Sequence, residues 1–102
     1  MRVLPLAELR AFLGRLHIAV AEERIEVRDY AIEGLRALEW SLVDLRLQLL
    51  DLTDSDFLRT EPSTAPEGGR IWVFTPDHWE GGFLWIRLVE RHGIVVISFH
   101  RG

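Results

Sequence analysis

Residues 85–102, WIRLVERHGIVVISFHRG, decide the fold, because two runs of β-branched and aromatic residues flank a short break, as in a β-hairpin. The break is His92-Gly93, and a two-residue turn there fixes which residues face each other across the hairpin. Counting outward from this turn pairs Arg91 with Ile94, Glu90 with Val95, Val89 with Val96, Leu88 with Ile97, Arg87 with Ser98, Ile86 with Phe99 and Trp85 with His100.

Alternation along the two strands divides the hairpin between two faces. The first face is mostly apolar and must be covered by other elements; it holds Leu84, Ile86, Leu88, Val95, Ile97 and Phe99, with Glu90 near the turn. The second face holds Trp85, Arg87, Val89, Ser98 and His100, with Val96 and Ile94 nearer the turn. An aromatic ring, a guanidinium, a hydroxyl and an imidazole are thereby grouped within reach of one small ligand. The same pattern also fits a face that is simply solvated.

The first half of the chain shows the apolar spacing of helices. Pro5 suits a first helical turn, and we expect a helix over residues 5–22. Residues 24–27 alternate between polar and apolar but are too few to assign, and helical spacing resumes over residues 29–38. Ser41, with an acidic residue three positions later, is predicted to cap a further helix. An apolar stripe follows this cap at Leu42, Leu45, Leu49 and Leu52.

Residues 53–56 repeat the capping pattern and predict one short turn that carries Phe57 and Leu58 inward. The next segment, residues 60–69 (TEPSTAPEGG), is typical of a surface loop. Strands are then expected at residues 70–75, 83–91 and 94–100. The sequence therefore predicts an α+β fold for residues 1–102, a single domain in which N-terminal helices pack on one face of a small antiparallel C-terminal sheet.

Charge is unevenly divided along the chain. All 12 basic residues are arginine, against 16 acidic ones, for a net charge of −4. Residues 1–56 carry this whole imbalance, and residues 57–102 are neutral. Overall acidity argues against long non-specific tracking along nucleic acid but permits a compact phosphate site in the second half. The chain has no cysteine and no run long enough to span a membrane, so we expect an intracellular protein.

Three motifs carry a family resemblance. They are LTDSDFLRT at residues 52–60, IWVF at residues 71–74 and LWIRLVERHGIVVISFH at residues 84–100. In this order and spacing they resemble the MqsR (motility quorum-sensing regulator) family of type II toxins. The resemblance implies a RelE-like ribonuclease fold and metal-independent endonucleolytic cleavage of mRNA in the cytoplasm. It also implies inhibition by a cognate antitoxin protein and leaves self-association open.

The family's functional positions fall on Arg59, Trp85, Arg87 and His100. By this resemblance the two arginines clamp the scissile phosphate, and His100 transfers protons, as an imidazole that titrates near neutral pH can. Trp85 stands where the family usually has tyrosine; it has no proton to transfer but can stack a base. Val73 replaces an amide-bearing residue of some members.

Other residues receive simpler interpretations. Ser98 shares the polar face of the hairpin, and His78, in the 76–82 loop, is a candidate for the edge of an RNA site. His17 is expected at the surface or its boundary and His92 in the turn. Trp72 and Trp79 are interpreted as packing residues. The histidine spacing predicts no metal site, and no cofactor is expected.

Two alternative functions remain open. The chain could be a non-catalytic binding module that keeps the toxin fold and pairs with an antitoxin-like protein or with itself. A plain RNA-binding domain is less favoured, because the sequence has neither a basic stripe nor the aromatic pattern of RNA-recognition strands.

Overall fold

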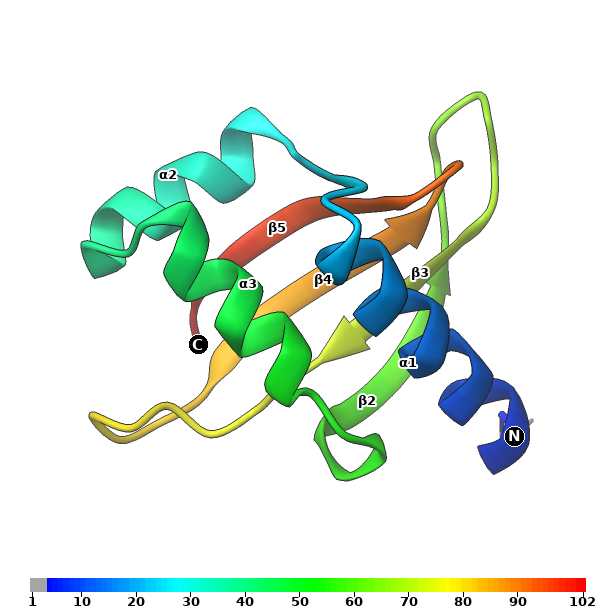
Figure 1. The fold of residues 1–102 in the computed structure, drawn as a ribbon, viewed down its shortest axis with the longest axis horizontal. Coiled ribbons are helices and arrows are strands. Elements are labelled where there is room, and N and C mark those ends of the chain that lie inside the picture. The colour runs from blue at the N-terminus through cyan, green and yellow to red at the C-terminus, as the bar shows by residue number, and fades with distance from the viewer. Residues whose placement is uncertain (1–3) are drawn as a thin grey trace.

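The computed structural model describes residues 4–102, which form helices first and most of a sheet afterwards (Figure 1). The helices are α1 (Leu6–Ala21), α2 (Asp29–Leu38) and α3 (Leu42–Asp51), followed by a 3-10 turn η1 (Asp54–Asp56). The strands are β1 (Ile25–Val27), β2 (Phe57–Pro62), β3 (Arg70–Phe74), β4 (Leu84–Glu90) and β5 (Ile94–Arg101). The α+β prediction is confirmed. No helix among the described residues is long and apolar enough to cross a membrane.

Local capping chemistry sets where α3 begins. The Ser41 hydroxyl accepts a hydrogen bond from the Asp44 backbone N–H at 3.3 Å, and the Asp44 carboxylate accepts from the Ser41 N–H at 2.8 Å. These reciprocal bonds satisfy donors that the first helical turn leaves free, so the predicted cap is confirmed. The leucine stripe behind it is confirmed from Leu45 onward, whereas Leu42 is half-exposed.

The sheet is mixed, with strand order β1-β5-β4-β3-β2. Strands β3, β4 and β5 pair antiparallel with one another, as predicted. The sheet gains two strands that were not predicted: β2 pairs antiparallel with β3, and β1 pairs in parallel with β5. The Ile94 N–H donates to the Arg24 carbonyl at 2.9 Å, and the Arg28 N–H donates to the Val96 carbonyl at 3.0 Å. β1 is only three residues long, and these backbone hydrogen bonds hold its two ends against β5.

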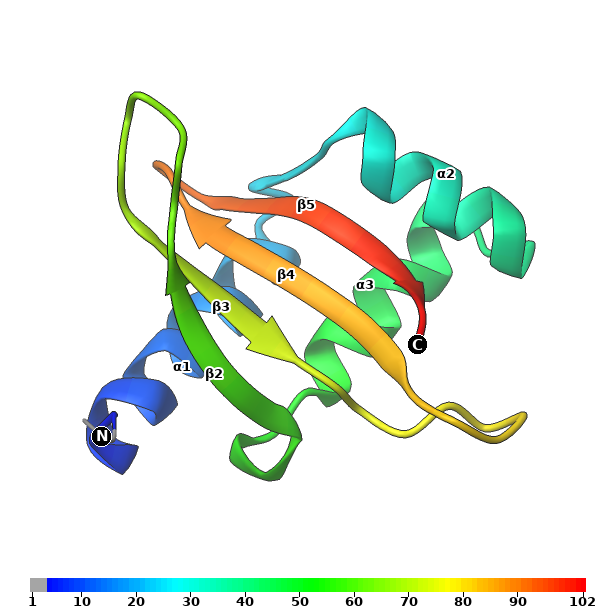
Figure 2. The same ribbon diagram turned by 180° about the vertical axis from the view of Figure 1, so that it is seen from behind.

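The helices cover one face of this sheet. α1 and α3 lie across it in Figure 1, and α2 packs along β5. The core between the layers is centred on aromatic rings: Phe12 of α1 stacks on Trp72 of β3 with ring centroids 4.2 Å apart. Seen from behind, β2 to β5 carry no helix of residues 4–102 (Figure 2). We call this uncovered side the open face. Trp72 packs as predicted, whereas Trp79 is 78% exposed and the packing interpretation for it is wrong.

The β4–β5 hairpin corrects the predicted register near its turn. Glu90 pairs with Ile94, so the turn holds three residues, and a β-bulge at Ile97 shifts the pairing back. From Ser98 onward the pairs are those predicted. On β5, between the turn and the bulge, each side chain lies on the face opposite to the one predicted. Ile94 and Val96 belong to the core cluster, and Val95 and Ile97 do not.

A second correction concerns β2. The segment expected to turn inward and then form a loop is instead an edge strand that reaches Pro62. A bulge between Phe57 and Arg59 lets Phe57 pack on the core while Leu58 is 44% exposed, so the inward placement of Leu58 is wrong. Proline and polar residues suit an edge strand, which is why this segment reads as a loop.

Replacing glycine by alanine is expected to have opposite effects on stability at two positions, Gly34 and Gly14. At Gly34 of α2 an added Cβ would lie 1.4 Å from the Phe99 carbonyl oxygen of β5, whereas at Gly14 of α1 it would meet nothing within 4 Å. We expect Gly34→Ala to lower the free energy of unfolding by about 3 kcal/mol or more through overpacking. Gly14→Ala is expected to raise it by up to about 1 kcal/mol through helix propensity. Urea unfolding followed by circular dichroism measures both; equal effects would contradict the close α2–β5 packing.

Candidate functional site

The strand register brings the predicted site residues together on the open face. Arg59 of β2 lies opposite Val73 of β3, which lies opposite Arg87 of β4, which in turn lies opposite Ser98 of β5. The next pair of β4 and β5 on the same face is Trp85 with His100. Arg59 and His100, which are 41 positions apart in sequence, therefore lie on the same face of the sheet, with β3 and β4 between their strands.

The centre of this surface is a carboxylate that sequence reasoning missed. Glu61 Oε1 accepts a hydrogen bond from Arg87 Nη2 at 2.8 Å, and Glu61 Oε2 accepts one from Arg59 Nε at 2.9 Å. Both carboxylate oxygens are thus engaged by guanidinium groups from two strands. The signal was obscured because Glu61 lies in the stretch that has the composition of a loop. Recognising β2 as a strand would have placed Glu61 on the same face as Arg59 by alternation.

The two arginines change the acid strength of Glu61. The hydrogen bond from Arg59 holds the pKa of the Glu61 carboxyl below its ordinary value, and Arg87 acts in the same direction, against an opposing effect of partial burial. Glu61 is therefore ionised at neutral pH and is a weak base. The pair of guanidiniums holds a bound anion, which in this structure is supplied by the protein itself.

Trp85 of β4 neighbours both Arg59 of β2 and His100 of β5. The Arg59 guanidinium carbon is 5.5 Å from the centroid of the Trp85 ring, a cation–π distance. On its other side, the His100 ring lies at a centroid distance of 6.4 Å with an interplanar angle of 19°. Next to Trp85 is a hollow of about 300 Å³ that Leu58, Thr75 and Phe83 also line. The hollow offers a flat aromatic surface beside a cationic group.

The hydrogen bonding of His100 defines its available nitrogen. Nδ1 lies 3.3 Å from the Arg101 carbonyl oxygen, which can only accept, so Nδ1 carries the proton in this contact. In the neutral ring Nε2 is then the free proton acceptor. The His100 side chain is half-buried, and its ring is held by the neighbouring Trp85.

The remaining predicted RNA-binding residues are less accessible. Ser98 belongs to the row by register but is only 4% exposed. His78 is 6% exposed, its Nδ1 accepts the Glu80 N–H at 3.0 Å, and its ring packs near Trp40 on the core side. The structure therefore does not bring His78 to the open face. Among residues 4–102, no three His, Asp or Glu side chains gather as a metal-binding group.

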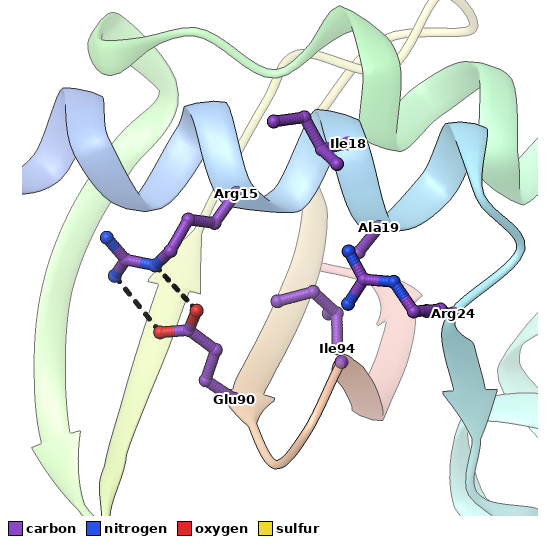
Figure 3. A pocket seen from close by; sticks show the side chains of 7 residues that line it. Arg15, Ile18, Ala19, Arg24, Glu90 and Ile94 are labelled. Atoms are coloured by element: carbon purple, nitrogen blue, oxygen red, sulfur yellow. Dashed lines mark hydrogen bonds and ion pairs between the residues drawn. The ribbon is translucent and has the colours of Figure 1, made fainter.

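A hollow of about 210 Å³ lies away from this surface, between α1 and the β4–β5 turn (Figure 3). Arg15 bounds it with two hydrogen bonds to Glu90, from Nε at 2.6 Å and from Nη2 at 3.0 Å. These bonds raise the pKa of Arg15 above its ordinary value. Both side chains are at least a third exposed, so this ion pair contributes little to the free energy of unfolding. Its hydrogen bonds join α1 to the end of β4 next to the turn.

The Glu61 bridge predicts a pH dependence of stability. A carboxyl whose pKa is lowered by folding contributes stability above its unfolded pKa and loses that contribution as pH falls through the folded pKa. We therefore expect Glu61→Gln to be less stable than the wild type at neutral pH. We also expect it to lose less free energy of unfolding than the wild type between about pH 5 and about pH 3.

Urea unfolding at a series of pH values measures this difference. Glu33→Gln on α2 is the matched control, because Glu33 is exposed and forms no ion pair within the described residues. Parallel pH profiles for all three proteins would contradict the coupling of Glu61 to the arginines.

Comparison with models of known protein families and with curated protein sequences finds no match to this chain. Membership of the MqsR family thus stays a prediction from the three sequence motifs. The α+β fold and the arginine, tryptophan and histidine cluster on its open face are established from the geometry alone.

Proposed function

We propose that this chain is a toxin of the type II class that cleaves single-stranded mRNA without a metal ion, on the open face of its sheet. The observation that carries the proposal is the convergence of Arg59 and Arg87 on a single anion, beside Trp85 and His100. Two guanidiniums from separate strands, aimed at one point, form the arrangement that recognises a phosphate by charge-assisted hydrogen bonds.

The chemistry that this arrangement supports is attack of a ribose 2′-hydroxyl on the adjacent phosphate. The 2′-oxygen forms a bond to phosphorus, the bond to the 5′-oxygen breaks, and a 2′,3′-cyclic phosphate and a free 5′-hydroxyl result. His100 Nε2 takes the proton from the 2′-hydroxyl, and the resulting imidazolium supplies the proton for the leaving 5′-oxygen. Arg59 and Arg87 stabilise the charge that develops on the phosphate oxygens.

Trp85 positions the substrate in this scheme. A base that stacks on its indole ring, in the hollow shared with Phe83, sets the neighbouring phosphate against the arginines. Stacking is worth about 1–3 kcal/mol per base and tolerates different bases. Sequence preference would then come from polar groups at the rim of the hollow, where Thr75 and Asp77 lie.

Glu61 takes the place of the phosphate in the free protein. RNA has to displace its carboxylate from the two guanidiniums before the phosphate can bind. The lowered pKa of Glu61 and the engagement of both its oxygens make it a poor proton acceptor, so we assign proton transfer to His100.

The proposal extends to the fold family, the cellular location and the protein partner. We place the chain with RelE-like ribonucleases, acting in the cytoplasm. A cognate antitoxin protein would inhibit it by covering the open face with acidic groups, which compete for the arginines as Glu61 does.

One observation favours a second candidate function. Both arginines of the cluster are already paired with Glu61, and the whole chain carries a net charge of −4. A non-catalytic module that binds a protein partner through the open face would need no free arginines. Cleavage of a defined RNA by the wild type, and its loss in His100→Ala, separates the two candidates: a non-catalytic module cleaves in neither form.

Removing the imidazole of His100 tests the proton-transfer role. We expect His100→Ala to cleave a defined single-stranded RNA at least about 100-fold more slowly than the wild type, with binding reduced far less. His92→Asn, which removes an imidazole from the turn at a position with φ of 59°, keeps wild-type activity. Gel analysis of labelled RNA measures the rates, and circular dichroism verifies folding. Undiminished cleavage by His100→Ala would remove His100 from the mechanism.

Removing the charge of Glu61 tests its role as a stand-in for phosphate. We expect Glu61→Gln to bind single-stranded RNA about tenfold more tightly than the wild type, because the arginines no longer lose an ionised partner on binding. Fluorescence anisotropy with a labelled oligonucleotide measures the affinity. If Glu61→Gln instead binds RNA as tightly as the wild type but no longer cleaves it, Glu61 acts as a general base and not as a stand-in for phosphate.

A further inference from the structure

A second hollow on the open face adjoins the site on the side of Arg87 away from Trp85. Its volume is about 410 Å³, within the range of small-ligand sites. Arg87 lines it together with Val89, two positions farther along β4, whereas Trp85, two positions in the other direction, lines the first hollow. Arg87 therefore lies between the two hollows, and a phosphate held by Arg87 would have one of them on each side.

Cationic groups from three separate elements line this hollow. Arg28 comes from the junction of β1 and α2, Arg87 from β4, and Arg91 from the β4–β5 turn. Arg91 Nη2 donates to the Gly68 carbonyl at 2.9 Å and to the Ser63 hydroxyl at 3.3 Å, which ties the 63–69 loop to the turn. The three arginines form the cationic rim of the hollow, and the hydrogen bonds of Arg91 fix the rim on the side of the 63–69 loop.

The floor of the hollow is apolar. Ile71, Val89 and Ile97 line it from three adjacent strands. Ile97 is on this side of the sheet because of the β5 bulge, since regular alternation up to Phe99 would have put it in the core. A flat aliphatic floor under a cationic rim fits a nucleotide, whose base is apolar on its faces and whose backbone is anionic.

The acidic groups near this rim are held weakly. Arg28 pairs with Glu26 at 3.1 Å, but both side chains are at least half exposed. Arg91 and Glu67 approach only to 4.0 Å. Exposed pairs of this kind contribute little to stability, so an incoming phosphate can replace the glutamates at both arginines.

We propose that this hollow is a second nucleotide subsite, which takes the residue of the RNA strand on the opposite side of the scissile phosphate from the base on Trp85. The base of that nucleotide lies on the aliphatic floor, and Arg28 contacts the next phosphate of the strand, on the side of that nucleotide away from the scissile phosphate; a two-nucleotide probe lacks this phosphate and a four-nucleotide probe supplies it. The proposal rests on the proposed function in that the ligand is single-stranded RNA. It extends that function because the site then binds more than one nucleotide, with the RNA strand running along β4 from Trp85 towards Val89.

The test compares RNA length in protein variants. The probes are fluorescein-labelled 2′-O-methyl oligonucleotides of two and four nucleotides, which cannot be cleaved by attack of a 2′-hydroxyl. Arg28→Gln removes one rim cation without disturbing the 63–69 loop, which Arg91 holds. Arg36→Gln is the matched control, because Arg36 is exposed on α2, lines neither hollow and carries the same charge.

We expect the wild type to bind the four-nucleotide probe about tenfold more tightly than the two-nucleotide probe. Arg28→Gln loses this gain and keeps the affinity for the shorter probe. Its slope of log affinity against log salt for the longer probe falls by about 0.7, the loss of one phosphate contact. Arg36→Gln behaves as the wild type.

The outcomes separate this subsite from the cleavage proposal. A wild type that cleaves RNA, with Arg28→Gln indistinguishable from Arg36→Gln, overturns the subsite alone. Equal weakening of both probes in both variants also overturns it, because a general charge effect then explains the binding. A wild type that does not cleave unmodified RNA, but whose length-dependent binding is lost in Arg28→Gln, supports the subsite and overturns the nuclease. Tighter capture of an acidic peptide than of either probe would assign the hollow to a protein partner instead.

Discussion

The alternation of side chains along β5 is the constraint on which the rest of the structure depends. A strand of fixed register sends every second residue to the same face, so one slip exchanges the core and the surface. The bulge at Ile97 resolves a conflict in this strand. Its turn-side half needs Ile94 and Val96 under the helices, and its other half needs Phe99 there. One extra residue between the halves satisfies both, and it leaves Ile97 and Ser98 on the open side together.

On the open face, a single carboxylate pairs with two arginines. Arg59 and Arg87 are fixed by a shared carboxylate, which keeps two like charges close together without mutual repulsion dominating. A preformed cation pair of this kind loses little side-chain freedom when an anion replaces the carboxylate. An incoming anion has to displace the Glu61 carboxylate from both arginines. Weakly binding anions are thereby excluded, and strongly binding ones lose part of their affinity. Trp85, under the Arg59 guanidinium, adds a surface that responds to bases and not to inorganic ions.

Much of this arrangement is predictable from the sequence, and the failures have physical causes. Helix limits followed from apolar spacing and from the Ser41 cap. The pairing of Trp85 with His100 was obtained from a turn one residue too short, because the bulge in β5 restores the register that the longer turn removes. Glu61 was missed because an edge strand with a proline has the composition of a loop. The β1 strand was unassignable because three residues acquire strand structure only from their partner.

The bulge and the proline of β2 also bear on how the protein behaves among copies of itself. A sheet with one uncovered face and two outer strands offers unpaired backbone groups to any extended chain nearby. At one edge, β1 is three residues long, too short to template a stable ladder. At the other, the bulge by Leu58 distorts the hydrogen-bonding row, and Pro62 removes a donor from its end. The surface that is left open for a ligand is thus bordered by edges that resist strand addition, so exposure of the site does not carry the usual risk of aggregation.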